Sequence, residues 1–390
     1  MRPSTRLARV PEFPFARWGD ACREAIEAGA DLIRLDVGNP DLPPPPEVID
    51  AARSALGDAS AHGYPGYRCV APLRRAIADY YDRRFSVSLD RESEICCLLG
   101  SKEGIVHLTE ALVDPGDVVL VPDPGYAPYA AAARLAGAEV IRFPLLAEHG
   151  HTPDFDAIDV DVAKRARILW LNYPNNPTGA AGGSDVFAEA VAFARAHDML
   201  LCHDAPYADV RFDGEPPGSL LASPGARSVA IEFNSLSKTY NMAGWRIGYA
   251  VGALAVLELL RRIRTNVDSG MFMPIQRAAV TALATDETWI ERRNTVYRER
   301  LTVLVELMDE LGFRASMPSA THYVWAGLPE GETSDAYARR LLRETGVAVA
   351  PGTFFGPGGE GFLRISATAA TERIHEAARR WSVWAGSRQE

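Results

Sequence analysis

The chain has 390 residues, of which 47% are hydrophobic, and it carries a formal net charge of -10 at pH 7. At about 150 residues per domain, this length predicts two or three domains with ample material for a core. The acidic balance opposes binding to nucleic acid or anionic lipid, and no run of about 18 apolar residues could span a bilayer. The arginines near the N-terminus precede no apolar signal core, so we expect a cytoplasmic globular protein.

Cysteine and histidine patterns give no sign of a metal site. The eight histidines show no helical pairing or cysteine partner, and the cysteines show no ligand spacing. An odd, sparse set of cysteines favours reduced thiols. The five are Cys22, Cys69, Cys96, Cys97 and Cys202.

The first segment is predicted to be an N-terminal arm, residues 1–45, that joins the smaller of two domains. It holds one amphipathic stretch and ends in the proline run Pro43–Pro46, which we expect to be a stiff, non-helical connector.

Residues 46–280 alternate short β-branched runs with helical patterns, which is typical of a mostly parallel sheet covered by helices on both faces. We predict a large α/β domain around a seven-stranded sheet. Its expected strands are Glu94–Leu99, Val118–Val121, Glu139–Phe143, Arg167–Asn172, Met199–His203, Ser228–Glu232 and Arg246–Val251.

The remainder, residues 281–390, predicts a smaller α/β domain. A helical pattern covers Thr288–Glu310, strands are expected near 322–326 and 362–366, and a last helix begins at Thr371. Gly356–Gly361 matches G-x-G-x-x-G but precedes a strand instead of opening a helix, so we predict a tight loop and no dinucleotide site.

Lys238 lies among small hydroxyl residues, Ser235 and Ser237, with Arg246 eight positions later. An amine can form an imine with a carbonyl group, while hydroxyls and a guanidinium can hold a phosphate dianion. Ser-x-Ser-Lys is also a common surface-loop sequence, so this segment alone leaves both interpretations open.

Asp204 and Tyr207 follow a hydrophobic run that is predicted to be a strand. In a doubly wound sheet, ligands bind at the carboxyl ends of the strands, so these two residues are placed to contact a ligand. A carboxylate there can keep a ring nitrogen protonated, and the phenol can donate to an oxygen on the same ring. The alternative is an aspartate that caps a turn. We interpret the neighbouring His203 as structural.

Two further turns follow predicted strands. The composition of Asn172–Gly179 indicates a turn whatever its function. Within it, Asn176 could donate a hydrogen bond to the same ring oxygen, and Asn176-Pro177 is a candidate cis peptide. Ser101 is expected to cap a helix whose free amides bind an anion, with plain capping as the alternative. Tyr126 could stack on a flat cofactor or pack as a loop aromatic.

In this order, these motifs make the chain resemble the fold-type I pyridoxal-5′-phosphate (PLP) aminotransferases over nearly its full length. The amino-acid sequences of three segments are most similar to the LL-diaminopimelate aminotransferase branch: Leu171–Pro177, Ser235–Met242 and Thr265–Gly270. The resemblance implies a Schiff base between PLP and Lys238, with Asp204 and Tyr207 in catalysis. The implied cofactor-binding residues are Tyr64, Ser101, Lys102, Tyr126, Asn176, Asp204, Tyr207, Ser235, Ser237, Lys238 and Arg246.

The resemblance also implies ping-pong transfer from an L-amino acid to a 2-oxo acid such as 2-oxoglutarate, in a homodimer with shared sites. Tyr64 and Asn266 would reach the partner's site. Arg364 would bind the substrate α-carboxylate beside the backbone of Gly38, with Asn176 also touching substrate.

Two departures concern the substrate. Phe13 stands where the branch commonly has a tyrosine, and Arg68 stands where it often has a glutamate, so another amino acid could replace diaminopimelate. A PLP-dependent C–S β-lyase is the alternative enzyme. A non-catalytic PLP-binding regulator is more remote, because the chain has no room for a basic helix-turn-helix before Arg34.

Overall fold

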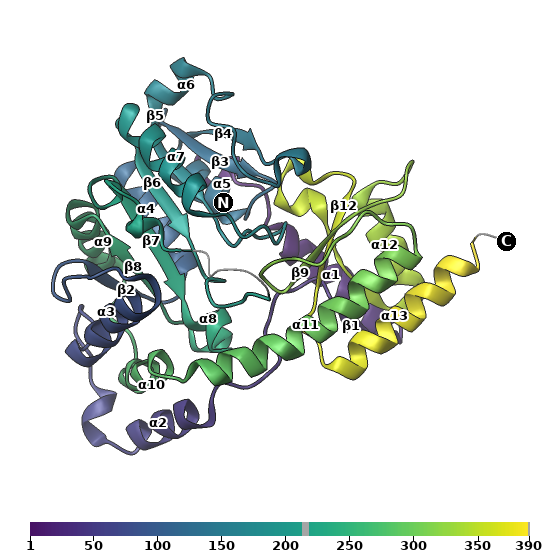
Figure 1. Ribbon diagram of the computed structural model, residues 1–390, viewed down its shortest axis with the longest axis horizontal. Helices are drawn as coiled ribbons and strands as arrows, with labels where there is room; N and C mark the ends of the chain where they lie inside the picture. The colour runs from purple at the N-terminus through teal and green to yellow at the C-terminus, as the bar shows by residue number, and fades with distance from the viewer. Residues whose placement is uncertain (213–217, 389–390) are drawn as a thin grey trace.

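A computed structural model describes residues 1–212 and 218–388 of the chain (Figure 1). Its larger part is built on a seven-stranded sheet in the order β2-β8-β7-β6-β5-β3-β4. Six strands share one direction, and β8 runs antiparallel to both neighbours. The strands are β2 (Ile95–Leu98), β3 (Val118–Asp123), β4 (Glu139–Pro144), β5 (Ala166–Leu171), β6 (Leu200–Asp204), β7 (Ala230–Ser235) and β8 (Gly248–Gly252). All seven predicted strands and the mostly parallel sheet are confirmed.

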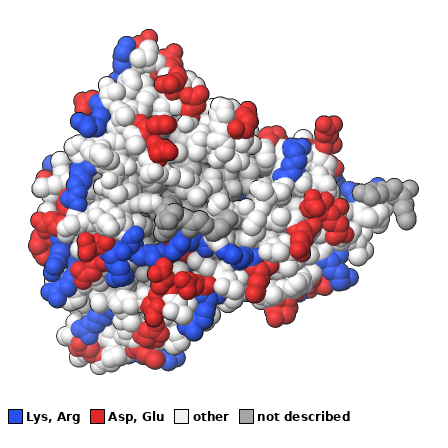
Figure 2. All heavy atoms as spheres, in the orientation of Figure 1, with Lys and Arg blue, Asp and Glu red and all other residues white. Residues whose placement is uncertain are grey.

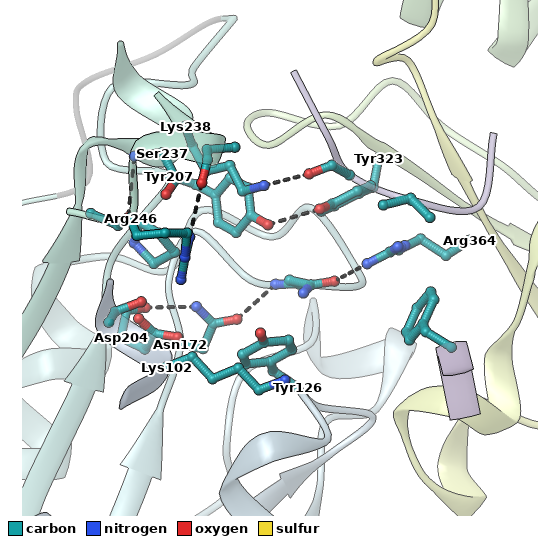
Figure 3. A pocket seen from close by; sticks show the side chains of 18 of the residues that line it. Lys102, Tyr126, Asn172, Asp204, Tyr207, Ser237, Lys238, Arg246, Tyr323 and Arg364 are labelled. Carbon is teal, nitrogen blue, oxygen red and sulfur yellow. Dashed lines mark hydrogen bonds between the residues drawn. The ribbon is translucent and has the colours of Figure 1, made fainter. Parts of the chain in front are cut away.

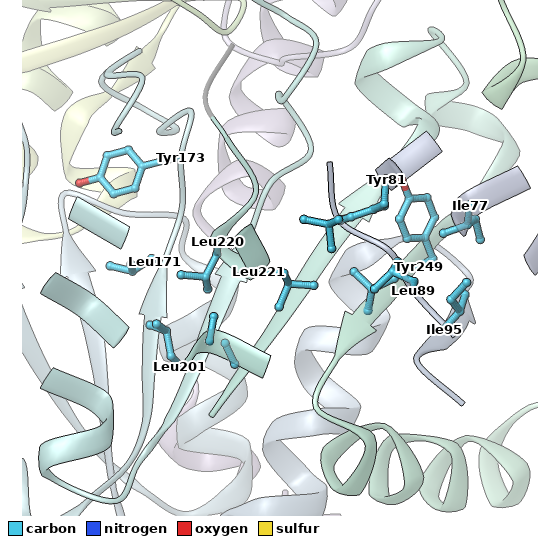
Figure 4. Packing of buried hydrophobic residues seen from close by; sticks show 14 of the residues in the cluster. Ile77, Tyr81, Leu89, Ile95, Leu171, Tyr173, Leu201, Leu220, Leu221 and Tyr249 are labelled. Carbon is cyan, nitrogen blue, oxygen red and sulfur yellow. The ribbon is translucent and has the colours of Figure 1, made fainter. Parts of the chain in front are cut away.

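Helices cover both faces of this sheet because successive residues of each strand point to opposite sides. On one face Trp170 and Phe233 pack under α4 (Ser101–Leu112), α5 (Pro128–Ala136) and α9 (Leu254–Val267). On the other face Leu171 and Leu201 belong to a second cluster, part of which Figure 4 shows with Tyr173 and Tyr81. The helices of that face are α2 (Pro46–Leu56), α3 (Ala71–Phe85), α6 (Val160–Arg165), α7 (Ser184–Ala196) and α10 (Met273–Leu283).

A smaller part joins the two ends of the chain around another core. Trp18, Tyr297 and Trp381 are buried together in it, and in Figure 1 the purple N-terminal segment lies among the green and yellow C-terminal elements. Its sheets are β11-β12-β9, which is antiparallel, and the parallel pair β1-β10. The elements are α1 (Pro14–Glu27), β1 (Ile33–Arg34), α11 (Glu287–Glu310), β9 (Tyr323–Gly327), α12 (Ser334–Thr345), β10 (Val347–Ala348), β11 (Ala350–Pro351), β12 (Phe362–Ser366) and α13 (Thr371–Gly386).

We propose that the chain divides into an arm, a large domain and a small domain at about residues 45 and 280. The pairing of β1 with β10 supports assigning the arm to the small domain. Because α10 packs on α2 and α3, the second boundary fits best just after Leu283.

Two sequence expectations about the fold were wrong. Pro46 is helical, since it opens α2 at the first helical position, where a missing amide hydrogen costs nothing. Cys69 and Cys97 form a disulfide, and the remaining three cysteines are free. Residue counting cannot detect this pair, because the fold brings the loop before α3 beside the edge strand β2.

The face of the molecule seen in Figure 2 carries mixed charge. Figure 2 shows acidic and basic side chains interspersed on this face, with a row of basic residues flanked by acidic ones. None of the helices in residues 1–212 and 218–388 has the length and apolar character needed to cross a bilayer. The described residues also form no cluster of metal-ligating side chains.

Gly356–Gly361 forms a loop that leads into β12, as predicted.

Candidate active site

A cavity of about 300 Å³ lies at the carboxyl ends of β6 and β7, between the two parts of the molecule (Figure 3). It brings together every predicted site residue except Tyr64 and Asn266. The residues that line it are Phe13, Phe15, Val37, Gly38, Ser101, Lys102, Tyr126, Asn172, Asn176, Asp204, Pro206, Tyr207, Ser235, Ser237, Lys238, Ala243, Arg246, Tyr323 and Arg364.

Asp204 ends β6 with one carboxylate oxygen fixed and the other unpaired. The Tyr129 hydroxyl donates to Oδ2 at 2.8 Å, and the Asn172 amide donates to the backbone carbonyl of Asp204 at 2.6 Å. Oδ1 is buried without a hydrogen-bond partner among the described residues. Burial raises the pKa of Asp204 to about 6, although the Tyr129 hydrogen bond opposes the shift. The free oxygen therefore needs a cationic or N–H donor from a ligand.

Lys238 is held inside the cavity by the short helix α8 (Leu236–Thr239). Ser235 caps this helix by accepting from the amide of Ser237 at 3.2 Å. The Lys238 ammonium donates to the carbonyl of Gly38. Burial, helped by repulsion from Arg364 and Arg246, lowers the pKa of Lys238 although Tyr323 opposes the shift. The lowered pKa favours the nucleophilic free amine.

An anion cradle lies at the N-terminus of α4. Gly100 occupies the N-cap position with φ 91°, and a Cβ there would meet Nη2 of Arg246 at 2.3 Å. Ser101 is the first helical residue and makes no capping bond, which corrects the expectation that it caps the helix. Arg246 forms no ion pair with any described acid and donates to backbone carbonyls. Free helix amides, Ser101 and this guanidinium are together suited to a phosphate.

Arg364 on β12 is oriented by two hydrogen bonds and a ring. Nη1 donates to Oδ1 of Asn176 at 2.8 Å and Nη2 donates to the carbonyl of Asp36 at 2.6 Å. Its guanidinium lies 4.0 Å from the ring centroid of Tyr323, and Nε is buried without a partner in the described structure. A fixed, planar guanidinium in a cavity is well suited to a carboxylate.

Three residues that line or support the cavity were not predicted from the sequence. The hydroxyls of Tyr323 and Tyr207 share a hydrogen bond of 2.8 Å. Burial opposes ionisation of Tyr323, but Arg364, Lys238 and this hydrogen bond outweigh burial and lower its pKa. Asn172 was predicted only to lie in a turn, although its position directly after a strand was an available signal. Tyr129, in an alanine-rich helix, gave none.

Lys102 and Phe13 contact each other at the wall of the cavity, with the ammonium 4.3 Å from the ring centroid. Burial and the nearby Arg246 lower the pKa of Lys102. Tyr64 and Asn266 lie outside the cavity, since Tyr64 is 91% exposed and the Asn266 amide donates to the carbonyl of Arg262. The Asn176-Pro177 peptide bond is cis.

The model of the family described as aminotransferase class I and II matches residues 30–380. The chain belongs to this family. The aminotransferase is 45% identical over 375 residues to an LL-diaminopimelate aminotransferase of Desulforudis audaxviator, covering 96% of each chain. It is 44% identical over 377 residues to an LL-diaminopimelate aminotransferase of Aquifex aeolicus, covering 97% of each.

Two solved structures are similar to the aminotransferase over nearly the whole chain. Substrate-bound BacF of Bacillus subtilis superimposes with a TM-score of 0.94 at 37% identity, covering 99% of this chain and 98% of that one. A probable N-succinyldiaminopimelate aminotransferase of Thermus thermophilus gives a TM-score of 0.89 at 40% identity, covering 94% and 98%. The resemblance inferred from the motifs is therefore confirmed.

Enzymes of this family use PLP, and the cavity of the aminotransferase fits that cofactor on its own observations. The unpaired Oδ1 of Asp204 matches a protonated pyridine nitrogen. The cradle of Gly100, Ser101 and Arg246 matches the phosphate. The buried amine of Lys238 matches the aldehyde.

Proposed function

We propose that this transaminase takes the amino group of an L-amino acid, with LL-diaminopimelate as the first candidate, and passes it to a 2-oxo acid such as 2-oxoglutarate by a ping-pong mechanism. The single observation that supports the site assignment is the meeting of Lys238, Asp204 and Arg364 around one cavity. The substrate is supported by about 44% identity to enzymes named for it.

Lys238, Asp204 and the α4 cradle would hold the cofactor, and Arg364 would bind the substrate α-carboxylate. When bound, PLP supplies an aldehyde for the amino group and a ring that accepts the electrons released at Cα. Asp204 keeps the ring nitrogen protonated. Lys238, as a free amine of lowered pKa, would remove the proton from the substrate Cα and deliver it to C4′ of the cofactor.

Orientation is the main task of the remaining groups. Arg364 anchors one end of the substrate through two parallel hydrogen bonds, and Tyr126 packs against the flat cofactor. Tyr207, with Asn176, is proposed to bond the ring oxygen. Tyr323 holds the Tyr207 hydroxyl in place and excludes water from the space beside Lys238.

We also propose a cytoplasmic homodimer in which Tyr64 and Asn266 complete the partner's site. The exposure of both side chains on one copy supports this arrangement. Sedimentation equilibrium of the holoenzyme tests it, and a catalytically active monomer would rule it out.

The substrate is tested by a panel of donors with 2-oxoglutarate as acceptor: LL-diaminopimelate, aspartate, alanine and phenylalanine. We expect LL-diaminopimelate to have the highest kcat/KM. If it is inert while another donor reacts, the proposed substrate is wrong and transamination stands. Pyruvate and ammonia formed from cystathionine without any 2-oxo acid would instead indicate the β-lyase.

A further inference from the structure

A buried acid and imidazole pair lies directly behind the active site, on the face of the sheet opposite Asp204. His203 and Glu232 are register partners on β6 and β7, and each is 1% exposed. Their side chains meet at 2.9 Å between Nδ1 and Oε2. Because strand residues alternate, His203 points away from the cavity that its neighbour Asp204 enters.

The far nitrogen of His203 contacts the backbone of the loop that follows β5. Nε2 lies 3.0 Å from the carbonyl oxygen of Tyr173 and 3.2 Å from its amide nitrogen. Phe187 packs edge-on against the imidazole at 4.8 Å between ring centroids. The ring is therefore fixed between an acid on one side and one peptide group on the other.

Glu232 is itself fully satisfied. Oε1 accepts from the hydroxyls of Tyr81 and Ser219 at 2.7 and 2.9 Å, and Oε2 accepts from the amide of Leu220 at 2.9 Å. Burial alone would raise the pKa of Glu232, but the bonds from His203, Tyr81 and Leu220 outweigh burial and lower it. A buried ionised acid with this many donors has one position only.

The loop at Tyr173 continues into the residues that orient Arg364. The side chain of Asn172 accepts from the amide of Asn176 at 2.8 Å, and Asn176 in turn accepts from Nη1 of Arg364 at 2.8 Å. Hydrogen bonds, together with the covalent chain between residues 172 and 176, thus connect Glu232 through His203 to the guanidinium.

We infer that His203 is a positioning residue for substrate binding, which holds the 172–176 loop so that Asn176 aligns Arg364 with the α-carboxylate. The inference rests on the proposed role of Arg364. It predicts that breaking the contact between His203 and Tyr173 weakens substrate binding more than it slows chemistry, since carboxylate binding is equal in ground and transition states.

Two conservative substitutions separate the two ends of the imidazole. His203→Asn keeps a polar atom near the position of Nδ1 and so retains the bond to Glu232. His203→Gln places its amide near the position of Nε2 and so retains the bond to Tyr173. Both bury an amide at the same point, which makes each the control for the other. Tyr81→Phe removes one bond to Glu232 without touching the loop.

The first measurement is the amino-donor half-reaction of the holoenzyme, followed by cofactor absorbance, with LL-diaminopimelate or, if that is inert, the fastest donor of the panel. For His203→Asn we expect the half-saturation concentration to rise about tenfold with the limiting rate within about threefold. His203→Gln and Tyr81→Phe should both stay within about threefold of the parent on the same scale.

The second measurement is hydrogen–deuterium exchange of the cofactor-free protein. His203→Asn should speed exchange at residues 172–180, and His203→Gln should not. Equal effects of the two variants on the half-saturation concentration, or unchanged exchange in His203→Asn, would overturn the inference. Arg364→Gln distinguishes failure of this inference from failure of the proposed function. If Arg364→Gln binds the amino donor as well as the parent does, the proposed role of Arg364 itself is wrong.

Discussion

The hydroxyls of Tyr207 and Tyr323 lie 2.8 Å apart, although 116 residues separate them in the chain. This bond joins the loop after β6 of the large sheet to β9 of the small one. The Tyr323 hydroxyl also occupies the space next to Gly38, where a Cβ would lie 1.8 Å from it. The substrate side of the cavity is therefore assembled from three segments that have no room to shift independently.

Gly38→Ala should disable the site without unfolding the protein. The new methyl group displaces the Tyr323 hydroxyl and so breaks its hydrogen bond to Tyr207. It also moves the Gly38 carbonyl, which accepts a hydrogen bond from the Lys238 ammonium. We expect kcat/KM to fall about 100-fold. Steady-state kinetics and a thermal melt measure the two effects.

Gly19→Ala is the matched control, since Gly19 lies within α1 and an added Cβ meets nothing within 4 Å. This variant should keep full activity and gain about 0.5 kcal/mol in stability, because alanine favours a helix interior. Comparable activities in the two variants would contradict the tight packing at Gly38.

Asp204→Asn should stabilise the cofactor-free protein while weakening cofactor binding. In the unfolded chain this carboxyl titrates near 3.8, whereas burial raises its pKa to about 6 in the fold. The folded state therefore binds more protons between these values, so stability falls as pH rises through them and the loss is complete above pH 6.

The asparagine variant lacks this loss, and its advantage should reach about 3 kcal/mol at pH 7 and vanish near pH 4. Urea unfolding of the cofactor-free proteins at both pH values measures it. Equal stabilities at pH 7 would show that the carboxylate is not strained by burial.

His322→Phe should make the protein more resistant to acid. His322 is fully buried, and neither ring nitrogen has a partner in the described part of the chain. Its ring lies 4.4 Å from that of Tyr297, so a phenyl group suits the same aromatic surroundings. Burial, with repulsion from Arg293 and Lys238, lowers the pKa of His322 well below its usual value.

Because only the unfolded chain binds the proton as pH falls below about 6.5, the parent loses stability there by about 1.4 kcal/mol per pH unit. The phenylalanine variant does not. Its advantage should therefore grow between pH 7 and pH 5 in urea unfolding. A pH-independent difference would contradict a buried neutral imidazole.

The disulfide between Cys69 and Cys97 closes a loop across a separation of 28 residues. On the chain-entropy estimate, reduction should cost about 3 to 4 kcal/mol of stability. Under denaturing, non-reducing conditions we expect three titratable thiols, as opposed to five in the reduced chain. Five thiols in freshly prepared oxidised protein would show that the pair is not bonded.

Much of this site was predictable because of where its residues stand along the chain. Asp204 and Lys238 each follow a hydrophobic run that had to be a strand, and strand ends meet at one edge of a parallel sheet. Arg364 could be placed only through the family resemblance.

The remaining contacts depend on packing that no local pattern records. Tyr323 appeared as one aromatic residue of a strand, and its hydroxyl gains a role only beside Gly38 and Tyr207. The pairing of Cys69 with Cys97 likewise needs the fold. His203 was interpreted as structural, and its contact with the loop at Tyr173 crosses between strands and has no signature in the sequence.

The central claim is that the amine of Lys238 holds the cofactor. The chain has only three lysines, Lys102, Lys164 and Lys238, so borohydride reduction of the holoenzyme followed by peptide mass spectrometry gives an unambiguous answer. The account predicts the reduced cofactor on the peptide that contains Lys238, with neither label nor turnover in Lys238→Ala. Label on Lys102 or Lys164, or full activity in Lys238→Ala, would contradict it.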